Sequence, residues 1–160
     1  MSTKQYAGFW LRFVALIIDT IIVNILQSFI IIPVLGMIGL SFASGYDFNF
    51  EDIPQDEAIG MLVAIFSAIS TMALLSTTIQ ILYYSLMESS KHQATIGKLA
   101  LGLQVTGMNG ERLDFLKALL RNISKIISSL LMMIGFLIAG FTEKKQALHD
   151  IIASTLVVKK

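Results

Sequence analysis

The segment Phe9–Ile22, "FWLRFVALIIDTII", decides the fold that we expect for this chain. All of its residues except Arg12 and Asp19 suit a helix that lies in lipid. Residues seven positions apart project from nearly the same helix face, roughly 10 Å apart along the axis. A carboxylate inside the hydrocarbon costs about 2.5 to 3.5 kcal/mol on insertion scales. Asp19 is therefore expected to face other helices, where it either finds a partner or takes up a proton.

The composition extends this view to the whole chain. Of its 160 residues 55% are hydrophobic and 14% are charged, whereas soluble domains carry about 25% charged residues. Charge-free runs cover 58–87 and 126–142, and Asp19 is the only charge between Arg12 and Asp47. About 20 apolar helical residues cross a bilayer. We predict an integral membrane protein, one domain over 1–160, with spans at about 9–32 and 61–86 and a third apolar helical segment at about 115–141.

Lysine and arginine are distributed unevenly, and they accumulate in cytoplasmic loops. The loop 41–60 holds only acidic charges, whereas the segment 88–125 is rich in lysine and arginine. This predicts a cytoplasmic N-terminus and an outer acidic loop. A third crossing would place the four lysines of 144–160 outside. We therefore predict an all-α membrane protein with two transmembrane helices and a third re-entrant or interfacial helical hairpin. The acids of the loop are Asp47, Glu51, Asp52, Asp56 and Glu57.

A short β structure is expected after the second span. In 99–105 leucine and valine alternate with smaller or polar residues, and Asn109-Gly110 is a typical hairpin turn. We predict a small cytoplasmic β-hairpin, which the β-prone C-terminal stretch "STLVVKK" can join. From Asp114 onward the pattern becomes that of an amphipathic helix at the inner leaflet. Gln27, in the first span, is expected to hydrogen-bond to another helix.

Four motifs together resemble the RDD family of prokaryotic membrane proteins: "YAGFWLRFVALIID", "TIGKLALGLQV", "LLRN" and "QALHDIIASTLVV". The resemblance covers nearly the whole chain. The family is named after one arginine and two aspartates, to which Arg12, Asp19 and Asp150 correspond. Ile96 departs from the pattern, since the family usually has proline there. The resemblance implies a prokaryotic cytoplasmic membrane location. Some members are reported as sodium/proton-type antiporters, and others are tied to membrane-stress or antimicrobial-peptide resistance or to regulation of membrane proteases.

The candidate site is therefore the charge network of Arg12, Asp19 and Asp150. Two interpretations remain open. In the first, the aspartates bind a proton or a small cation alternately, as intramembrane acids do in proton relays. In the second, Asp19 is neutralised by Arg12, Arg121 or Lys98, and the pair locks the helices together.

Four further residues support the candidate site: Lys98, Arg121, Lys125 and His149. Arg121 and Lys125, like Lys117, can supply counter-charges to the aspartates or bind anionic lipid headgroups, and headgroup binding is favoured. Arg121 is the preferred exception because it lies in "LLRN". His149 either tunes the proton affinity of Asp150 or is a surface histidine, and the surface position is favoured.

Several kinds of chemistry have no matching motif. The chain contains no cysteine, and its two histidines show no metal-ligand spacing. "TIGKLA" lacks the glycine and the Ser/Thr of a phosphate loop, and no serine-hydrolase motif occurs. We expect neither an enzyme, a metal site, a cofactor nor a nucleic-acid partner.

Two functions are therefore expected. The first is an oligomeric monovalent cation/proton antiporter that uses the intramembrane aspartates and arginine. The alternative is a non-transporting accessory or regulatory membrane protein, in membrane-protease regulation or in resistance to cationic antimicrobial peptides and envelope stress. The expected partners are the lipid bilayer, with anionic lipids at its cytoplasmic face, and either further copies of the chain or another membrane protein.

Overall fold

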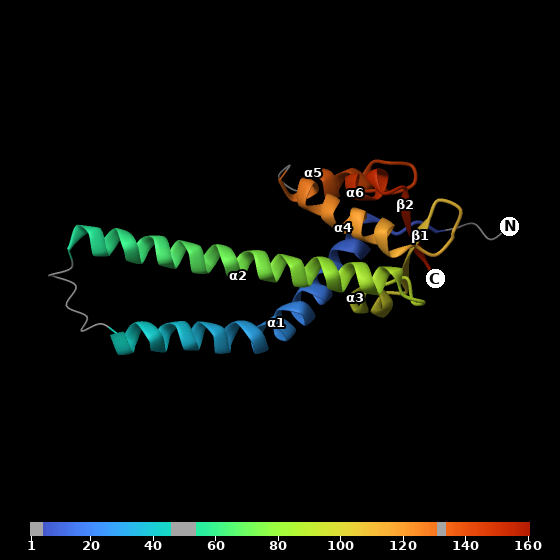
Figure 1. Ribbon diagram of the computed structural model, residues 1–160. Coiled ribbons are helices and arrows are strands. Elements are labelled where there is room, and N and C mark those ends of the chain that lie inside the picture. Colours follow the sequence, from blue (N-terminus) through green and yellow to red (C-terminus); the bar gives the residue numbers. More distant parts are fainter. Residues whose placement is uncertain (1–4, 46–53, 131–133) are drawn as a thin grey trace. The chain divides into compact units, whose positions relative to one another are not determined.

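A computed structural model describes residues 5–45, 54–130 and 134–160 of the chain (Figure 1). The chain forms two compact units. Unit 1 consists of Met1–Ile22 and Gln80–Lys160, and unit 2 consists of Val23–Ile79. The two long helices, α1 (Phe9–Gly45) and α2 (Gln55–Ser89), each contribute to both units.

Helices α1 and α2 each contain a stretch that is long and apolar enough to cross a membrane. These stretches are Phe9–Met37 and Ala58–Ser89, each with a mean hydropathy of 2.2. This confirms two apolar helices at the predicted places, although both extend beyond the predicted limits. Helix α1 continues through Pro33. In lipid a helix tolerates proline because leaving the helical conformation would expose more unpaired backbone groups.

In unit 2 a reciprocal pair of hydrogen bonds joins the two helices. The Gln27 side-chain amide donates to the Ser76 carbonyl at 2.9 Å, and the Ser76 hydroxyl donates to Gln27 Oε1 at 3.0 Å. This confirms the helix-to-helix role expected of Gln27. Large apolar side chains elsewhere in the unit face outward, such as Phe29 and Phe66, which are 75% and 74% exposed. Such a surface suits lipid rather than water.

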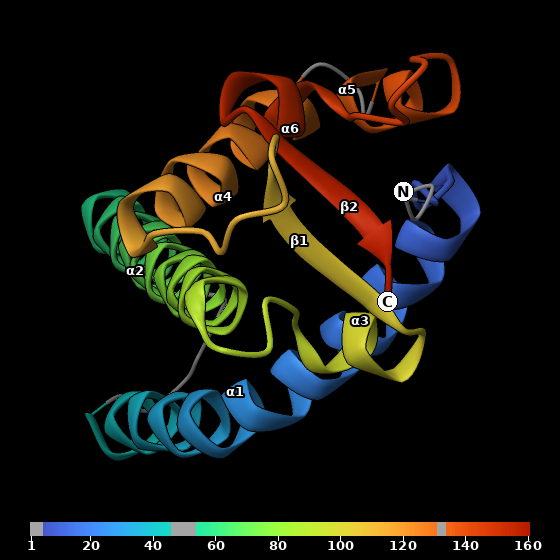
Figure 2. The ribbon, with the colours of Figure 1, turned by 90° about the vertical axis from the view of Figure 1, so that its right-hand side faces the viewer.

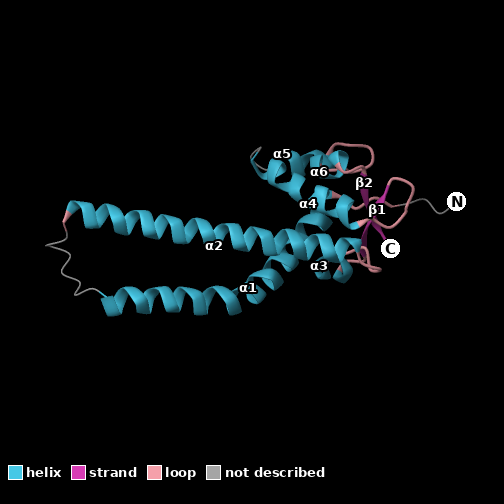
Figure 3. Ribbon diagram, viewed as in Figure 1, coloured by secondary structure: helices cyan, strands magenta, loops and turns pink. Residues whose placement is uncertain are grey.

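Unit 1 contains a two-stranded antiparallel sheet of β1 (Leu103–Gly107) and β2 (Thr155–Lys159), shown in Figures 2 and 3. The N-terminal residues extend it. The Ala7 amide donates to the Val157 carbonyl and the Lys159 amide donates to the Gln5 carbonyl, both at 2.9 Å. The two ends of the chain therefore lie at the same small sheet.

The predicted local hairpin is wrong in its strand pairing. The turn at Asn109-Gly110 does form, since the Gly110 amide donates to the Gly107 carbonyl at 3.0 Å. However, 111–114 is a loop, and β1 pairs with the C-terminal strand β2. The β-prone stretch that was expected to join the sheet is its second strand. Burial explains why β1 pairs with β2 and not with residues 111–114, because β2 is buried over Thr155–Val158.

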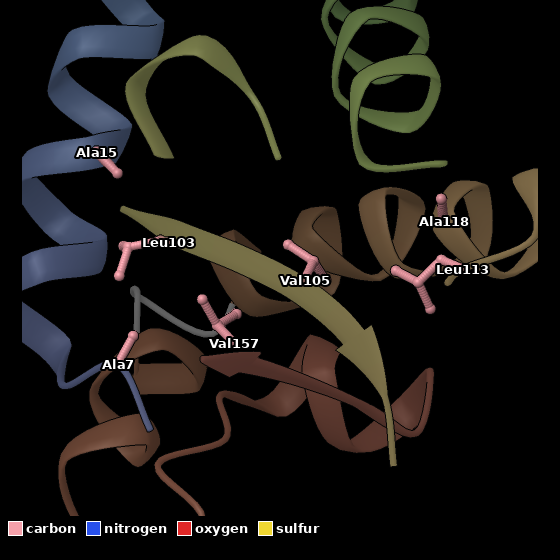
Figure 4. Close-up of a cluster of buried hydrophobic side chains, with 7 residues drawn as sticks. All are labelled: Ala7, Ala15, Leu103, Val105, Leu113, Ala118 and Val157. Atoms are coloured by element: carbon pink, nitrogen blue, oxygen red, sulfur yellow. The ribbon is translucent and has the colours of Figure 1, made fainter. Parts of the chain in front are cut away.

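A small apolar cluster lies between the sheet, the start of α1 and helix α4 (Phe115–Leu130) (Figure 4). Three of its members are alanines, so each side chain buries little area and the cluster supplies only part of the stability of unit 1. The members are Ala7, Ala15, Leu103, Val105, Leu113, Ala118 and Val157.

The remaining helices of unit 1 are short except for α4. They are α3 (Ile96–Ala100), α4 (Phe115–Leu130), α5 (Ile134–Leu137), the 3-10 helix η1 (Ile138–Gly140) and α6 (Leu148–Ile152). In the described part of 115–141 the third apolar segment consists of α4, α5 and η1, and none of these meets the length and hydropathy of a membrane span.

Helix α4 is amphipathic, as predicted, with its polar face turned into unit 1. Arg121, Asn122 and Ser128 are buried, whereas Leu116 and Leu120 on the other side are exposed. Ile123, Ile126 and Ile127 are exposed as well. A soluble amphipathic helix has the opposite arrangement. The outward apolar face suits contact with lipid.

Candidate functional site

Asp19 caps the N-terminus of α3. Its Oδ1 atom accepts a hydrogen bond from the Gly97 backbone N–H at 2.7 Å, and Oδ2 accepts one from the Thr95 hydroxyl at 2.5 Å. The Tyr83 hydroxyl lies 3.3 Å from Oδ1 and also reaches the Ile96 amide. The first amides of a helix have no partner within it, so a carboxylate supplied by another helix satisfies them. Asp19 is 1% exposed.

The close packing of α3 on α1 depends on Gly97. A Cβ atom at this position would lie 2.3 Å from the Ala15 carbonyl oxygen and 2.9 Å from the Asp19 carboxyl carbon. No side chain fits there without moving one helix from the other. The glycine of "TIGK" is therefore required so that the α3 backbone can reach Asp19.

The expected cation partner of Asp19 is not found. Among the described residues Asp19 takes part in no ion pair. Its hydrogen-bond donors are neutral, namely the Gly97 backbone amide and the hydroxyl groups of Thr95 and Tyr83. This corrects the structural interpretation, in which Arg12, Arg121 or Lys98 neutralised Asp19.

Asp150 lies in a different environment, between two arginines. Arg121 donates from Nε at 2.9 Å and from Nη2 at 2.7 Å to Asp150 Oδ1, and Arg12 forms an ion pair with Oδ2. The Ala147 amide donates to Oδ2 at 3.1 Å, which caps α6. Asp150 is 0% exposed. Charge-assisted hydrogen bonds of this kind are roughly twice as strong as neutral ones.

Glu88, near the end of α2, joins a second group of charges to the same arginine. Arg121 Nη1 lies 2.6 Å from Glu88 Oε1, and Lys98 forms an ion pair with the same oxygen. The Asn122 side-chain amide donates to Oε2 at 3.1 Å. Glu88 is fully buried. Arg121 therefore bridges two carboxylates that come from α2 and α6.

Lys125 and His149 lie at the edge of this network. Lys125 Nζ is 3.8 Å from Glu88 Oε1 and 4.2 Å from the centre of the Tyr84 ring. The His149 ring nitrogens lie 3.5 Å from Ser128 Oγ and 3.5 Å from Asp150 Oδ1. His149 is 3% exposed, so the favoured surface position is wrong. Phe136 of α5 lies against the imidazole ring, with the two ring centres 5.1 Å apart.

Burial and neighbouring charges set the protonation states. Burial raises the pKa of the Asp150 carboxyl, but Arg121 and Arg12 outweigh it and hold that pKa below its ordinary value. Burial holds the pKa of His149 well below its ordinary value, so the ring is neutral at pH 7. Burial lowers the pKa of Lys125 to about 7. Asp150 is therefore a carboxylate held by two guanidinium groups.

The structure brings together most of the candidate residues. Arg12, Arg121 and His149 each contact Asp150, and Glu88 connects Lys98 and Lys125 to Arg121. Asp19 belongs to a separate site at α3. Arg121 is buried in the network, and Lys117 forms an exposed ion pair with Glu111 at 3.7 Å.

Glu88 was missed in the sequence. It directly follows the charge-free run of α2, which gives it the position of a flanking loop residue. The spacing of polar residues along the helix was a possible signal, because Ser85 lies three residues before Glu88 and the two therefore share one helix face. In the structure both side chains contact Asn122.

Two apolar helices long enough to span a bilayer, joined to a unit with a charged interior and an apolar face on α4, indicate a membrane protein. The chain belongs to the RDD family, whose model matches residues 6–154. This confirms the resemblance seen in the motifs.

Two relatives from Bacillus subtilis strain 168 match over nearly the whole chain. The uncharacterized protein YxaI is 38% identical over 157 residues, which is 98% of this chain and 99% of YxaI. The uncharacterized membrane protein YteJ is 28% identical over 160 residues, which is 99% of this chain and 84% of YteJ. No solved structure matches the chain.

Proposed function

We propose that this chain is a multi-pass protein of the prokaryotic cytoplasmic membrane that acts as a non-transporting accessory or regulatory protein. In this proposal α1 and α2 cross the bilayer and unit 1 lies at its cytoplasmic face, where anionic lipids and another membrane protein contact it. The name of the relative YteJ, a membrane protein, supports the location.

The pairing of the chain ends supports two crossings. Gln5 and Ala7 precede the first span and hydrogen-bond to Val157 and Lys159. Backbone groups that pair in this way lie on the same side of the membrane, which requires an even number of crossings between them. In this arrangement the apolar face of α4 and the short α5 and η1 lie in the inner leaflet without crossing it. The abundance of lysine and arginine in unit 1 supports a cytoplasmic side.

The observation that carries the non-transporting role is the state of the three buried carboxylates. Asp19 accepts hydrogen bonds from Thr95 and Gly97, Asp150 is held by two arginines, and Glu88 is held by Arg121 and Lys98. A cation/proton exchanger needs a carboxylate that releases its protein partners and binds an ion. Releasing one of these carboxylates would leave buried cations or helix amides without partners. The network therefore suits a structural role.

The other surfaces fit this proposal. The outward apolar side chains of unit 2 provide a face for lipid, for further copies of the chain or for helices of another membrane protein. The outer acidic loop, expected to attract cationic peptides, includes Asp47, Glu51 and Asp52, which lie outside the described residues. The cation/proton exchange expected from the sequence stays a prediction, and the flux experiment below decides between the two functions.

Proteoliposomes that enclose a pH-sensitive dye test this function. We expect wild-type protein to give no more proton movement on addition of Na⁺ or K⁺ than protein-free liposomes. The Asp19→Asn variant should behave identically. Cation-dependent proton movement by the wild-type protein that Asp19→Asn abolishes would establish exchange and overturn the proposal.

The proposed topology is tested separately with single cysteines, because the chain has no native cysteine. Gln55→Cys lies at the start of α2 and Lys160→Cys at the C-terminus. An impermeant thiol reagent applied to intact cells should label position 55 alone. Labelling at both positions would mean a third crossing, and labelling at position 160 alone would mean the opposite orientation.

A further inference from the structure

An apolar pocket lies in unit 1 at the N-terminal end of the first candidate span. Its volume is about 450 Å³, and α1, η1 and the following turn line it. Carbon atoms dominate the wall, and Lys145 is the only charged residue among the lining residues. The lining residues are Gly8, Phe9, Trp10, Leu137, Ala139, Gly140, Phe141 and Lys145.

Two of the aromatic residues that line the pocket are largely exposed. Trp10 is 73% exposed and Phe141 is 89% exposed. Trp10 lies within the first turn of the candidate span Phe9–Met37, and tryptophan at such a position is typical of the headgroup level of a bilayer. The pocket therefore opens where lipid headgroups meet acyl chains.

Lys145 is held at the pocket by an ordered turn. The Lys145 amide donates to the Thr142 carbonyl at 3.0 Å, and the Gln146 amide donates to the Thr142 hydroxyl at 2.7 Å. Lys145 has φ of 49°, in the left-handed region that non-glycine residues seldom occupy. Its Nζ atom lies 3.9 Å from the position that a Cβ atom on Gly8 would take. Within the described residues it forms no ion pair.

We propose that this pocket binds an anionic phospholipid, with one acyl chain against Trp10, Leu137 and Phe141 and the headgroup phosphate on Lys145. The apolar wall fits a hydrocarbon chain, and the Lys145 ammonium, which has no ion-pair partner among the described residues, complements a phosphate. An acyl chain is the apolar ligand that a bilayer supplies at this level. The site requires only that unit 1 lies against the bilayer, so it holds whether or not the protein transports ions.

Trp10 makes the site directly measurable, because it is the only tryptophan in the chain. Full-length protein is reconstituted into phosphatidylcholine vesicles that contain either brominated phosphatidylglycerol or brominated phosphatidylcholine at equal bromine content. Bromine on an acyl chain quenches tryptophan fluorescence only at short range. We expect about five-fold stronger relative binding of the brominated phosphatidylglycerol, the factor that one lysine near an anionic surface supplies.

Three variants locate the binding. Lys145→Gln should abolish the preference for the anionic lipid, whereas Lys144→Gln, which removes the adjacent charge outside the pocket lining, should keep it. A Cβ atom on Gly140 meets no atom within 4 Å. Gly140→Leu therefore fits the backbone, occupies the pocket and should reduce quenching by both lipids. Circular dichroism of each variant verifies folding.

Two outcomes would overturn this proposal. Equal quenching of the wild-type protein by both brominated lipids would show that Trp10 senses bulk lipid. An equal loss of preference in Lys144→Gln and Lys145→Gln would show general surface attraction in place of a site. Neither outcome affects the flux experiment, so failure of the lipid site and failure of the accessory function are distinguishable.

Discussion

The surroundings of Asp19 and of Asp150, the two aspartates of the family name, differ in kind. Asp19 accepts hydrogen bonds from a backbone amide and two hydroxyl groups, whereas Asp150 is held between two guanidinium groups. Both are almost completely buried. Asp19 therefore needs to be a hydrogen-bond acceptor, and Asp150 needs to be an anion. Two buried aspartates thus have two different roles. Substitution by asparagine distinguishes the roles, because asparagine keeps the shape and an acceptor oxygen but loses the negative charge.

The largest effect is expected for Asp150→Asn. It leaves Arg12 and Arg121 buried with one carboxylate fewer, and removal of one partner from a buried ion pair costs about 3 to 5 kcal/mol. We expect the free energy of unfolding in detergent micelles, followed by circular dichroism, to fall by this amount. A loss as small as that of Asp19→Asn would remove the distinction between the two aspartates.

A smaller loss is expected for Gly97→Ala, which disturbs the Asp19 site through its backbone. The added Cβ would lie 2.3 Å from the Ala15 carbonyl oxygen, and overpacking of this kind costs about 1 to 3 kcal/mol. Gly140→Ala is the matched control, since its Cβ meets no atom within 4 Å. Thermal unfolding of the two variants in the same detergent measures the difference, and equal midpoints would show that α3 does not rest on α1.

Asp19→Asn should cost at most about 1 kcal/mol, the value of a charge at a helix N-terminus. The amide oxygen can still accept from Gly97, and the new NH₂ group can donate to the Thr95 hydroxyl. Asp19→Ala should cost more, about 1 to 2 kcal/mol, because the cap itself is lost. The free energies of unfolding of both variants in detergent micelles show which of the two losses is larger. A loss of several kcal/mol in Asp19→Asn would mean that the negative charge is essential.

A further effect concerns pH. The pKa of Lys125 is lowered to about 7, and burial also lowers the pKa of Lys98 despite its pairing with Glu88. Above pH 7 the unfolded chain therefore binds more protons than the folded protein, so stability rises with pH up to the ordinary lysine pKa of about 10.4. Lys125→Met should flatten this rise, and Lys144→Met should not. Micelle unfolding between pH 7 and 10 measures the slopes, and parallel slopes would contradict the prediction.

The long helices and the residues of the charge network could be predicted because each has a local signal. Hydropathy located α1 and α2, and the motifs identified Arg12, Asp19, Arg121 and Asp150. The partner of β1 could not be predicted, because the turn at Asn109-Gly110 favours a local hairpin while the actual strand lies at the far end of the chain. Only burial of both strands in unit 1 makes that distant pairing favourable.

The partners of the two aspartates could not be predicted from the sequence for a related reason. An aspartate inside an apolar helix indicates a need for compensation but not its source. Thr95 and Gly97 reach Asp19 only after α3 has packed on α1. Nothing in the sequence indicates that the backbone amide of a particular glycine donates a hydrogen bond to a distant carboxylate. The role of Glu88 in the charge network could not be predicted, since a charge at the end of an apolar run is typical of the boundary of a membrane span.

The charged residues of α1 have their partners far along the chain, at residues 95–97 and 150, and this has a consequence for biosynthesis. Helix α1 is synthesised long before Thr95, Gly97 and Asp150, so under the proposed topology Arg12 and Asp19 reach the bilayer without these partners. Asp19 obtains its partners once residues 95–97 have emerged, whereas Arg12 obtains its carboxylate only with Asp150. A nascent chain that stops short of Asp150 therefore leaves Arg12 without its carboxylate, which distinguishes it from the finished protein for any protease that degrades incomplete products.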